Sequence, residues 1–266
     1  MKSPLTANRV AEYDREGYLI IKHPIFSPEK FVRLHQYCAG KFAEINKGAD
    51  LPALYDCPHW ADPRIFEWIM APEMLDLVEP LIGPDIGIFA CHLLQKPPGV
   101  GKRVPWHEDS AYWKGALTPM EVASITIALD PSIPENGGLR VIPGTHKHGY
   151  SDYVDVARPQ DEVFPIEVKK SQMDESKAVD LGLQPNEASI HHGKIIHGSN
   201  PNTGKIYRSV LTVRYFPTTV KFTKENHPHF AAAKFNIYLA RGRDHAGNTY
   251  ADPTKSYVGG EPVHTA

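Results

Sequence analysis

The stretch VPWHEDSAYW, residues 104–113, places a histidine and a carboxylate two residues apart. In an extended chain alternate side chains point to the same face, so His107 and Asp109 project an imidazole and a carboxylate side by side. Glu108 between them faces the other way and is not expected to bind the same ion. Two histidines and one carboxylate on a metal leave three coordination positions open, which is typical of non-haem Fe(II) oxygenases. The stretch therefore predicts two ligands of an iron site and requires one more histidine.

The second histidine must come from a distant strand, and the segment 195–199 offers His197. His191 and His192 are the competing candidates, and their adjacent side chains point to opposite faces of a strand. The H-x-D pair has little weight alone, because a chain with 14 His in 266 residues is expected to hold roughly one such pair by chance. The surrounding sequence must therefore support the assignment.

Composition limits the class of protein. A chain of 266 residues with 41% hydrophobic residues can bury a full core, and we expect one domain over 1–266. The 29 Lys and Arg nearly balance the 31 Asp and Glu, so no nucleic-acid or membrane-surface partner is expected. Cys38, Cys57 and Cys91 have no metal-like spacing and are expected to be free thiols in a reducing compartment. With no signal sequence and no apolar run near the ~18 residues of a membrane span, a soluble, cytoplasmic protein is expected.

Helical patterns precede strand patterns along the chain. An amphipathic helix near residue 10 stops at Gly17, and a strand follows. Ser27 is the expected N-cap of a second helix, with Pro28 at its first position. The segment 63–82 is expected to form two helices separated near Pro72. From residue 86 the pattern changes to strands, with segments expected at 86–95, 121–130, 187–192 and 206–216.

The connections suggest how these strands are arranged. The turn signal Asn136-Gly137-Gly138 predicts a hairpin across 123–143. The polar stretch 150–178 has no period and is expected to form a lid, and the tail 230–266 is expected to wrap the surface. Helices followed by antiparallel strands predict an α+β domain whose helices pack on a two-sheet sandwich or jelly roll. We expect a helical part over 1–85, a jelly-roll core over 86–216 and a C-terminal extension over 217–266.

Several motifs, in this order, resemble the phytanoyl-CoA dioxygenase family over roughly residues 10–216. They are YxxxGYL at 13–19, KPPG at 96–99, WHxD at 106–109, ALD at 128–130, ENGGLxxIPGxH at 135–146, HGSxxN at 197–202 and RxxLTxRY at 208–215. The resemblance implies a double-stranded β-helix, a cupin-like jelly roll, that uses Fe(II), 2-oxoglutarate and O2 and releases succinate and CO2. Beyond residue 216 no motif matches.

The resemblance also implies roles for particular residues. Family members place an arginine about eleven residues after the second histidine ligand, and Arg208 has that spacing from His197. The implied metal ligands are therefore His107, Asp109 and His197. Arg208 is expected to pair with the C5 carboxylate of 2-oxoglutarate through its planar fork, and Ser199 to donate a further hydrogen bond. Two other histidine pairs lack a carboxylate and a downstream arginine and are expected to lie on the surface, namely His146 with His148 and His227 with His229.

The presence of Asp109 favours hydroxylation, desaturation or ring formation, because related halogenases replace this carboxylate with a small residue. Two alternatives stay open at this point. A non-catalytic or Zn-bound jelly-roll binding protein would use the same ligands, because Zn(II) outcompetes Fe(II) at most such sites. An iron oxygenase that does not use 2-oxoglutarate is the other alternative, and the position of Arg208 argues against it.

The substrate is expected to be a small molecule, and the sequence implies no particular oligomeric state. Residues near the ligands in sequence or on the same strand face are the candidates for substrate binding, namely Gln95, Tyr112, Trp113, Arg140 and Arg214. A buried Arg214 would need an acidic partner, so an anionic substrate beneath the 150–178 lid is expected, with an internal carboxylate as the competing partner.

Overall fold

The computed structural model of the chain describes residues 5–47, 53–232, 235–258 and 261–262. Its helices begin and end where local chemistry dictates. The side chain of Thr6 accepts a hydrogen bond from Arg9 at the start of the first helix, and left-handed Gly17 ends it. Ser27 caps the second helix in the same way, as expected. The α-helices are α1 (Ala7–Glu16), α2 (Pro28–Asn46), α3 (Pro58–Ala61), α4 (Phe66–Ile69), α5 (Pro72–Ile82) and α6 (Pro228–Ala232).

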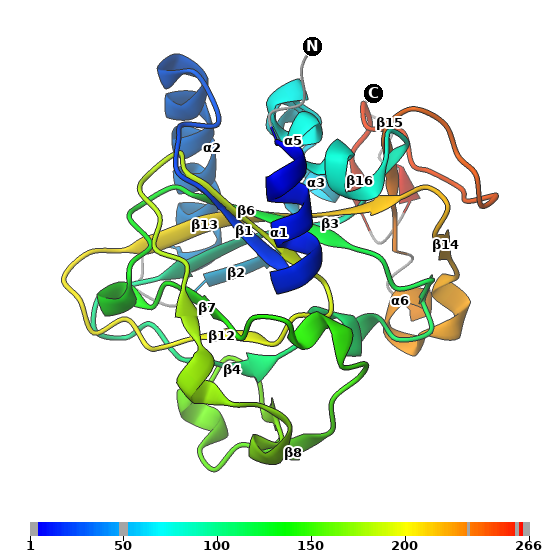
Figure 1. Cartoon of the computed structure of the whole chain (residues 1–266). Helices are drawn as coiled ribbons and strands as arrows, with labels where there is room; N and C mark the ends of the chain where they lie inside the picture. Colours follow the sequence, from blue (N-terminus) through cyan, green and yellow to red (C-terminus); the bar gives the residue numbers. More distant parts are fainter. Residues whose placement is uncertain (1–4, 48–52, 233–234, 259–260, 263–266) are drawn as a thin grey trace.

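Two antiparallel sheets face each other (Figure 1). The larger sheet contains, in spatial order, β1 (Tyr18–Ile21), β11 (Ala188–His192), β6 (Ala123–Ala128), β13 (Arg208–Pro217), β3 (Ile86–Lys96) and β15 (Tyr238–Arg241), and β2 (Ala53–Asp56) also pairs with β3. The smaller sheet contains β10 (Val179–Asp180), β7 (Leu139–Val141), β12 (His197–Ser199) and β4 (Val104–His107). Short pairs join β5 (Leu117–Thr118) to β14 (Lys221–Phe222), β8 (Tyr153–Asp155) to β9 (Ile166–Val168) and β16 (Tyr257–Val258) to β17 (Glu261–Pro262).

Strand alternation gives the larger sheet two different faces. On β13, Leu211 and Val213 point to the main core together with Leu34 of α2 and Met74 of α5. Figure 1 shows α1, α2 and α5 on this outer side of the sheet. Each fully buried aliphatic side chain contributes roughly 1.5–3 kcal/mol, so this layer holds the helices to the sheet. The alternate residues of β13, including Arg208, face the smaller sheet and are available for a site.

Two expectations from the sequence were wrong. No hairpin spans 123–143, because β6 pairs with β11 and β13 in the larger sheet, whereas β7 pairs with β10 and β12 in the smaller one. The side chain of Asn136 bonds back to the backbone of Ile133 and Pro131, so the turn signal directs a crossing between sheets. The C-terminal extension does not merely wrap the surface, because β15 pairs with β3 at the edge of the larger sheet.

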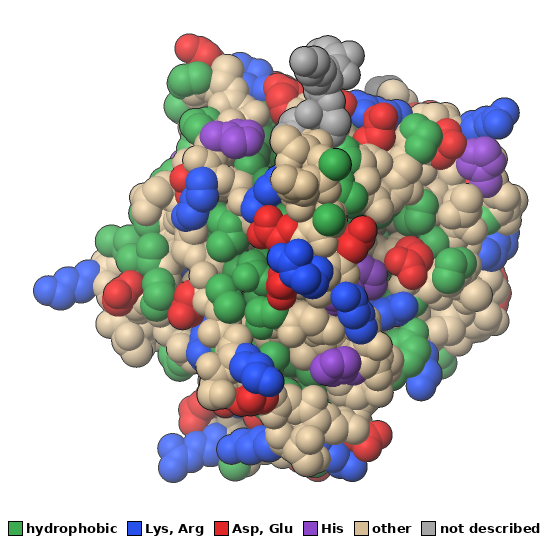
Figure 2. Space-filling view, in the orientation of Figure 1, with side chains coloured by type: hydrophobic (Ala, Val, Ile, Leu, Met, Phe, Trp, Pro, Cys, Tyr) green, Lys and Arg blue, Asp and Glu red, His purple; other side chains and the backbone are tan. Residues whose placement is uncertain are grey.

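The surface carries charges of both signs. On the face drawn in Figure 2, Lys and Arg side chains are interspersed with Asp and Glu, so no patch of one sign forms there. Cys38, Cys57 and Cys91 are buried free thiols, which confirms that expectation. Among the helices that the structure describes, none has the length and apolar character needed to cross a bilayer.

Candidate metal centre and cavity

Strand pairing in the smaller sheet brings two distant histidines together. His107 on β4 lies directly opposite His197 on β12, and their ring centroids are 4.2 Å apart. Glu108 keeps an extended backbone, so Asp109 at the start of η2 (Asp109–Trp113) returns to the face of His107. Asp109 Oδ1 lies 3.7 Å from His107 Nε2 and 3.8 Å from His197 Nε2. All three candidate ligand atoms lie within 4.8 Å of one another, so the structure brings the three residues together.

Backbone carbonyls orient both imidazoles. The Nδ1 atom of His107 lies 2.8 Å from the carbonyl of Pro105, and that of His197 lies 3.0 Å from the carbonyl of Ile195. A carbonyl can only accept, so each Nδ1 carries the proton and each Nε2 presents a lone pair toward Asp109. This outer hydrogen bond is the usual partner of a metal-binding histidine. The two rings are therefore arranged as ligands before any metal binds.

Arg214 fixes the carboxylate of Asp109. Its Nε and Nη2 atoms each lie 3.0 Å from Asp109 Oδ2, which leaves Oδ1 directed at the two histidines. Burial alone would raise the pKa of Asp109, but the charge of Arg214 and the neighbouring histidines hold that pKa well below its usual value. Two neutral nitrogens and one ionised oxygen form a donor set that suits a divalent metal such as Fe(II) and leaves further coordination positions open.

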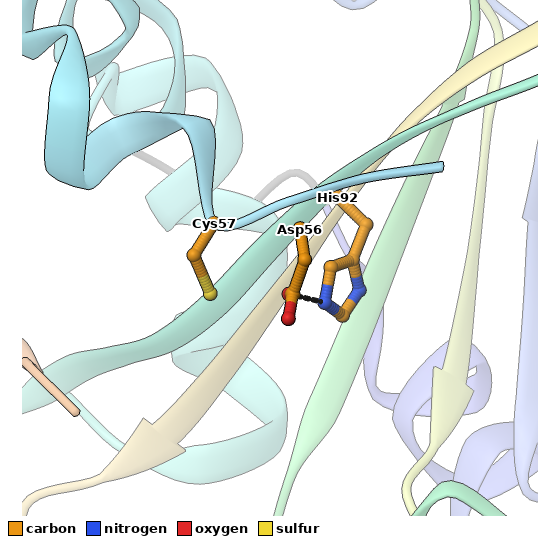
Figure 3. A group of neighbouring side chains, drawn as sticks. All are labelled: Asp56, Cys57 and His92. Atoms are coloured by element: carbon orange, nitrogen blue, oxygen red, sulfur yellow. Dashed lines mark hydrogen bonds and ion pairs between the residues drawn. The ribbon is translucent and has the colours of Figure 1, made fainter. Parts of the chain in front are cut away.

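A second group of potential ligands, Asp56, Cys57 and His92, lies on β2, just after it and on β3 (Figure 3). Arg214 donates to His92 Nδ1, so His92 Nε2 carries the proton that it donates to Asp56 Oδ1 at 2.5 Å. Burial raises the pKa of the Cys57 thiol well above its usual value, so the thiolate that a metal needs is disfavoured. Both nitrogens of His92 are already hydrogen-bonded, so this group is a poor metal site. It instead forms a chain of hydrogen bonds from Asp109 through Arg214 and His92 to Asp56.

The triad opens into a cavity of about 590 Å³ between the two sheets. Apolar and aromatic side chains form most of its wall, and polar groups gather at the triad and along β13. Residues that line it include His92, Thr126, His191, Arg208, Thr212 and Arg214 from the larger sheet; His107, Asp109, Tyr112, Trp113, His197 and Ser199 from the smaller sheet and η2; and Val163, Phe164, His227, His229, Phe230 and Phe235 from later segments. This volume is within the range of small-molecule sites.

One end of the cavity is prepared for an anion. The side chain of Arg208 is buried, and its Nε has no hydrogen-bond partner among the residues described. Desolvation lowers its pKa to about 10, so Arg208 stays charged at neutral pH. Beside it, buried Lys96 donates to Ser199 Oγ at 2.6 Å and to the carbonyl of Asn200 at 2.7 Å. Burial and the charge of Arg208 both lower the pKa of Lys96, and a bound carboxylate would relieve both cations.

The structure brings some of the predicted substrate residues to the cavity and not others. Tyr112, Trp113 and Arg214 line it. Gln95 faces the opposite side of β3, where it donates to Ser209 and lines a separate pocket beside α2. Arg140 also lies elsewhere, with Asp180 3.4 Å and Glu175 3.6 Å from its guanidinium and the ring of Trp106 beneath it. Strand alternation explains the error at Gln95, because its neighbour Leu94 lines the cavity instead.

Sequence reasoning missed several cavity residues. Lys96 of the KPPG motif does not line the cavity itself, but it donates to Ser199, which does, and nothing in the sequence indicated this contact. His227 and His229 were expected on the surface, and His229 is exposed, but both also line the cavity with Phe230 of α6. No sequence signal placed α6 there, because the family motifs end near residue 216. His191 was considered only as a competing metal ligand, and it lies in the wall beside the triad.

Comparison with known proteins agrees with this geometry. The family model described as phytanoyl-CoA dioxygenase (PhyH) matches residues 13–210. L-proline trans-4-hydroxylase from Streptomyces griseoviridis is 28% identical over 239 residues, which cover 81% of this chain and 87% of the relative. Ectoine dioxygenase from Sphingopyxis alaskensis is 26% identical over 225 residues, which cover 75% of this chain and 72% of the relative.

Solved structures show the same fold at lower identity. The non-heme monooxygenase ThoJ in its apo form superimposes with a TM-score of 0.70 at 22% identity, over 88% of this chain and 84% of that one. EctD from S. alaskensis, solved with 2-oxoglutarate and 5-hydroxyectoine, gives a TM-score of 0.66 at 21% identity, over 82% of this chain and 78% of that one.

Proposed function

The chain belongs to the phytanoyl-CoA dioxygenase family of Fe(II)- and 2-oxoglutarate-dependent oxygenases, and on that premise we propose how its residues serve the reaction. We propose a single domain in which the two sheets form a double-stranded β-helix, and in which His227, Phe230 and Phe235 from beyond β13 complete the wall of the cavity. The observation that carries this proposal is a preorganised His107, Asp109 and His197 triad that shares one cavity with a buried Arg208 whose Nε bonds to no described residue.

The triad would hold the metal through His107 Nε2, Asp109 Oδ1 and His197 Nε2. Arg208, with Lys96 and Ser199 beside it, would hold the C5 carboxylate of 2-oxoglutarate. When bound, iron and 2-oxoglutarate supply the oxidising chemistry, in which O2 is consumed, succinate and CO2 are released and one oxygen atom is available to oxidise a C–H bond. The chain itself supplies orientation, fixed charges and the exclusion of water.

The aromatic wall of the cavity and the segment that carries the β8–β9 hairpin would exclude water from the metal site. Val163 and Phe164 of this segment line the cavity, and the ring of Phe164 lies 5.1 Å from that of His107. We propose that the segment acts as a lid. Arg103, next to β4, pairs with Glu162 at 2.8 Å and with Glu167 at 2.6 Å, which ties the lid to the strand that carries His107.

We propose hydroxylation, or a related desaturation or ring closure, of a small metabolite, because Asp109 retains the carboxylate ligand. The expectation of an anionic substrate loses its support. Arg214 pairs with Asp109, and Arg140 pairs with Asp180, so neither guanidinium needs an anion from a substrate. L-proline and ectoine, which two relatives are named for, are the first compounds to test.

The experiment is an aerobic assay of succinate release with Fe(II), 2-oxoglutarate and a panel of amino acids, ectoine, carboxylates, phosphonates and amines. We expect the wild-type protein to release succinate, and to release more of it with a panel compound that is a substrate. His197→Ala should release none. The alternative of a Zn-bound binding protein would show ligand binding with no succinate under any condition. A His197→Ala variant that releases succinate at the wild-type rate would also contradict the proposal.

A further inference from the structure

His191 is a buried histidine whose hydrogen-bonding groups are unused. On β11 the side chains of Ala188 and Ile190 join the outer core, so alternation turns His191 toward the cavity that it lines. Its side chain is 3% exposed. Neither Nδ1 nor Nε2 has a hydrogen-bond partner among the residues that the structure describes. Burial of a polar group without a hydrogen-bond partner is unfavourable, because the group loses its contact with water. A bound ligand is therefore expected to supply the partner of His191.

The other histidines around the metal centre are all engaged. His107 and His197 each donate from Nδ1 to a backbone carbonyl, and His92 bridges Arg214 and Asp56. His191 differs from them, although its ring centroid is only 4.8 Å from that of His197. Its Nε2 lies 4.0 Å from Asp109 Oδ2, an oxygen that already accepts two N–H groups of Arg214. His191 thus faces the triad without being one of its ligands.

The proposed cosubstrate brings an acceptor that needs a donor at this place. Its C5 carboxylate would pair with Arg208, and its C1 carboxylate would need a hydrogen-bond donor beside the triad. Arg214 already donates to Asp109 and His92, which holds its guanidinium at those two residues. The hydroxyls of Thr126 and Thr212 bond to each other at 3.0 Å. Besides Arg208, the cavity side chains with a buried polar atom that has no partner in the described part of the chain are His191, Tyr112 and His227. Of these, His191 and Tyr112 have ring contacts with the ligand histidines.

The surroundings of these two donors differ. Tyr112 follows the ligand strand in η2, and its ring lies 6.0 Å from that of His107 and 5.5 Å from that of Phe164 in the lid. It therefore belongs to the side of the cavity that the lid covers. His191 belongs to the larger sheet, the sheet that also carries Arg208, and lies beside His197 and Asp109. Donors at Arg208 and His191 would thus serve the two ends of one dicarboxylate.

We propose that His191 is a cosubstrate-binding residue that donates an imidazole N–H to the C1 carboxylate of 2-oxoglutarate. This inference rests on the proposed function. It also explains why a polar side chain is buried beside the metal ligands, where strand alternation would equally allow an apolar one.

The test compares His191→Leu, which removes the donor, with His191→Gln, which keeps an N–H at a similar reach. The readouts are Mn(II) or Fe(II) affinity and the anaerobic affinity for 2-oxoglutarate, measured by the weak visible absorption of an Fe(II) complex chelated by a 2-oxo acid. We expect wild-type metal affinity in both variants. The 2-oxoglutarate affinity should fall roughly 10- to 100-fold in His191→Leu, as for the loss of a hydrogen bond to a charged group, and recover in part in His191→Gln. Tyr112→Phe is the matched control and should keep its 2-oxoglutarate affinity.

Several outcomes would overturn the inference. If His191→Leu keeps the wild-type 2-oxoglutarate affinity and absorption band, the proposed hydrogen bond does not exist. If both variants lose metal binding, His191 is a metal ligand instead. If His191→Leu does not fold, the wild-type protein still decides the matter. In the Zn(II) form labelled with 15N-histidine, 2-oxoglutarate should bring one more imidazole N–H into slow exchange, and no new signal would refute the proposal. Failure of the proposed function itself is distinguishable, because wild-type protein would then show no 2-oxoglutarate complex at all.

Discussion

Arg214 is the residue on which the charge state of the metal centre depends. Its two N–H groups hold Asp109 Oδ2 at 3.0 Å and help to keep the carboxylate ionised. Replacing it with Gln should raise the pKa of Asp109 toward and above its ordinary value. The affinity for Mn(II) at neutral pH should then fall by about 10- to 100-fold, as for other outer-sphere partners of metal ligands.

The sign of the pH dependence follows from the same contact. In the wild-type protein the pKa of Asp109 lies well below its ordinary value, so its carboxylate should remain available to the metal in mildly acidic solution. In Arg214→Gln, metal binding should be lost at a higher pH than in the wild type. Arg140→Gln is the control, because Arg140 lies outside the cavity. Calorimetric Mn(II) titrations across pH would test this, and equal pH profiles for wild type and Arg214→Gln would contradict it.

Arg208 is predicted to lower the stability of the ligand-free protein, although it provides the binding group for 2-oxoglutarate. Its guanidinium is buried, its Nε bonds to none of the residues that the structure describes, and buried Lys96 lies close enough for the two charges to repel. Arg208→Met should therefore unfold at a higher temperature than the wild type when no 2-oxoglutarate is present. Adding 2-oxoglutarate at about 100 times its Kd should stabilise the wild type by about 2.7 kcal/mol and leave Arg208→Met unchanged. Thermal unfolding with and without 2-oxoglutarate measures both effects, and a lower melting temperature for Arg208→Met would argue against the unpaired cation.

Among the helices and strands, local sequence signals predicted where helices begin and end better than they predicted which strands pair. Gly17, Ser27 and Pro72 mark helix boundaries through capping and backbone constraints that act over a few residues. The turn at Asn136 was recognised, but whether it closes a hairpin or crosses between sheets depends on distant strands. The ligand set could be predicted because His107, Asp109 and the family spacing from His197 to Arg208 are all local patterns.

The ion pairs of Arg103 are predicted to hold the proposed lid in place. Arg103→Met would leave Glu162 and Glu167 without their shared cation. Hydrogen exchange across 153–168 should then speed up by about 10-fold, with Mn(II) affinity unchanged. Lys169→Met is the matched control, because its 3.3 Å pair with Asp152 is exposed and worth little. Equal exchange rates in Arg103→Met and wild type would show that these ion pairs do not hold the lid.

In the molecule as a whole, the two faces of the larger sheet have different roles, one in stability and the other in the proposed chemistry. Its outer face packs on the helices, and its inner face carries Arg208, Arg214 and His191. The contribution of α6 and β15 could not be predicted, because both reach the domain through long-range contacts that local sequence patterns do not encode.

This separation makes a prediction about Leu34 in α2, which is fully buried in the outer core. Leu34→Ala should lower the free energy of unfolding by about 2–5 kcal/mol through the cavity that it leaves. Metal and 2-oxoglutarate affinities at low temperature should stay unchanged. Val32→Ala on the exposed side of the same helix is the control and should change stability by less than about 0.5 kcal/mol. Denaturant unfolding and Mn(II) titration check both, and a loss of metal affinity in Leu34→Ala would show that the two faces are coupled.

The central claim is that the triad and Arg208 together bind one iron and one 2-oxoglutarate. The most direct measurement is anaerobic titration of the Fe(II) protein with 2-oxoglutarate, followed by visible absorption. The wild type should develop the weak charge-transfer band of a chelated 2-oxo acid and saturate at one equivalent per chain. Arg208→Lys should bind iron normally but need a higher 2-oxoglutarate concentration, because it loses the two-pronged contact. A wild-type protein that binds Fe(II) but develops no band at saturating 2-oxoglutarate would contradict the account.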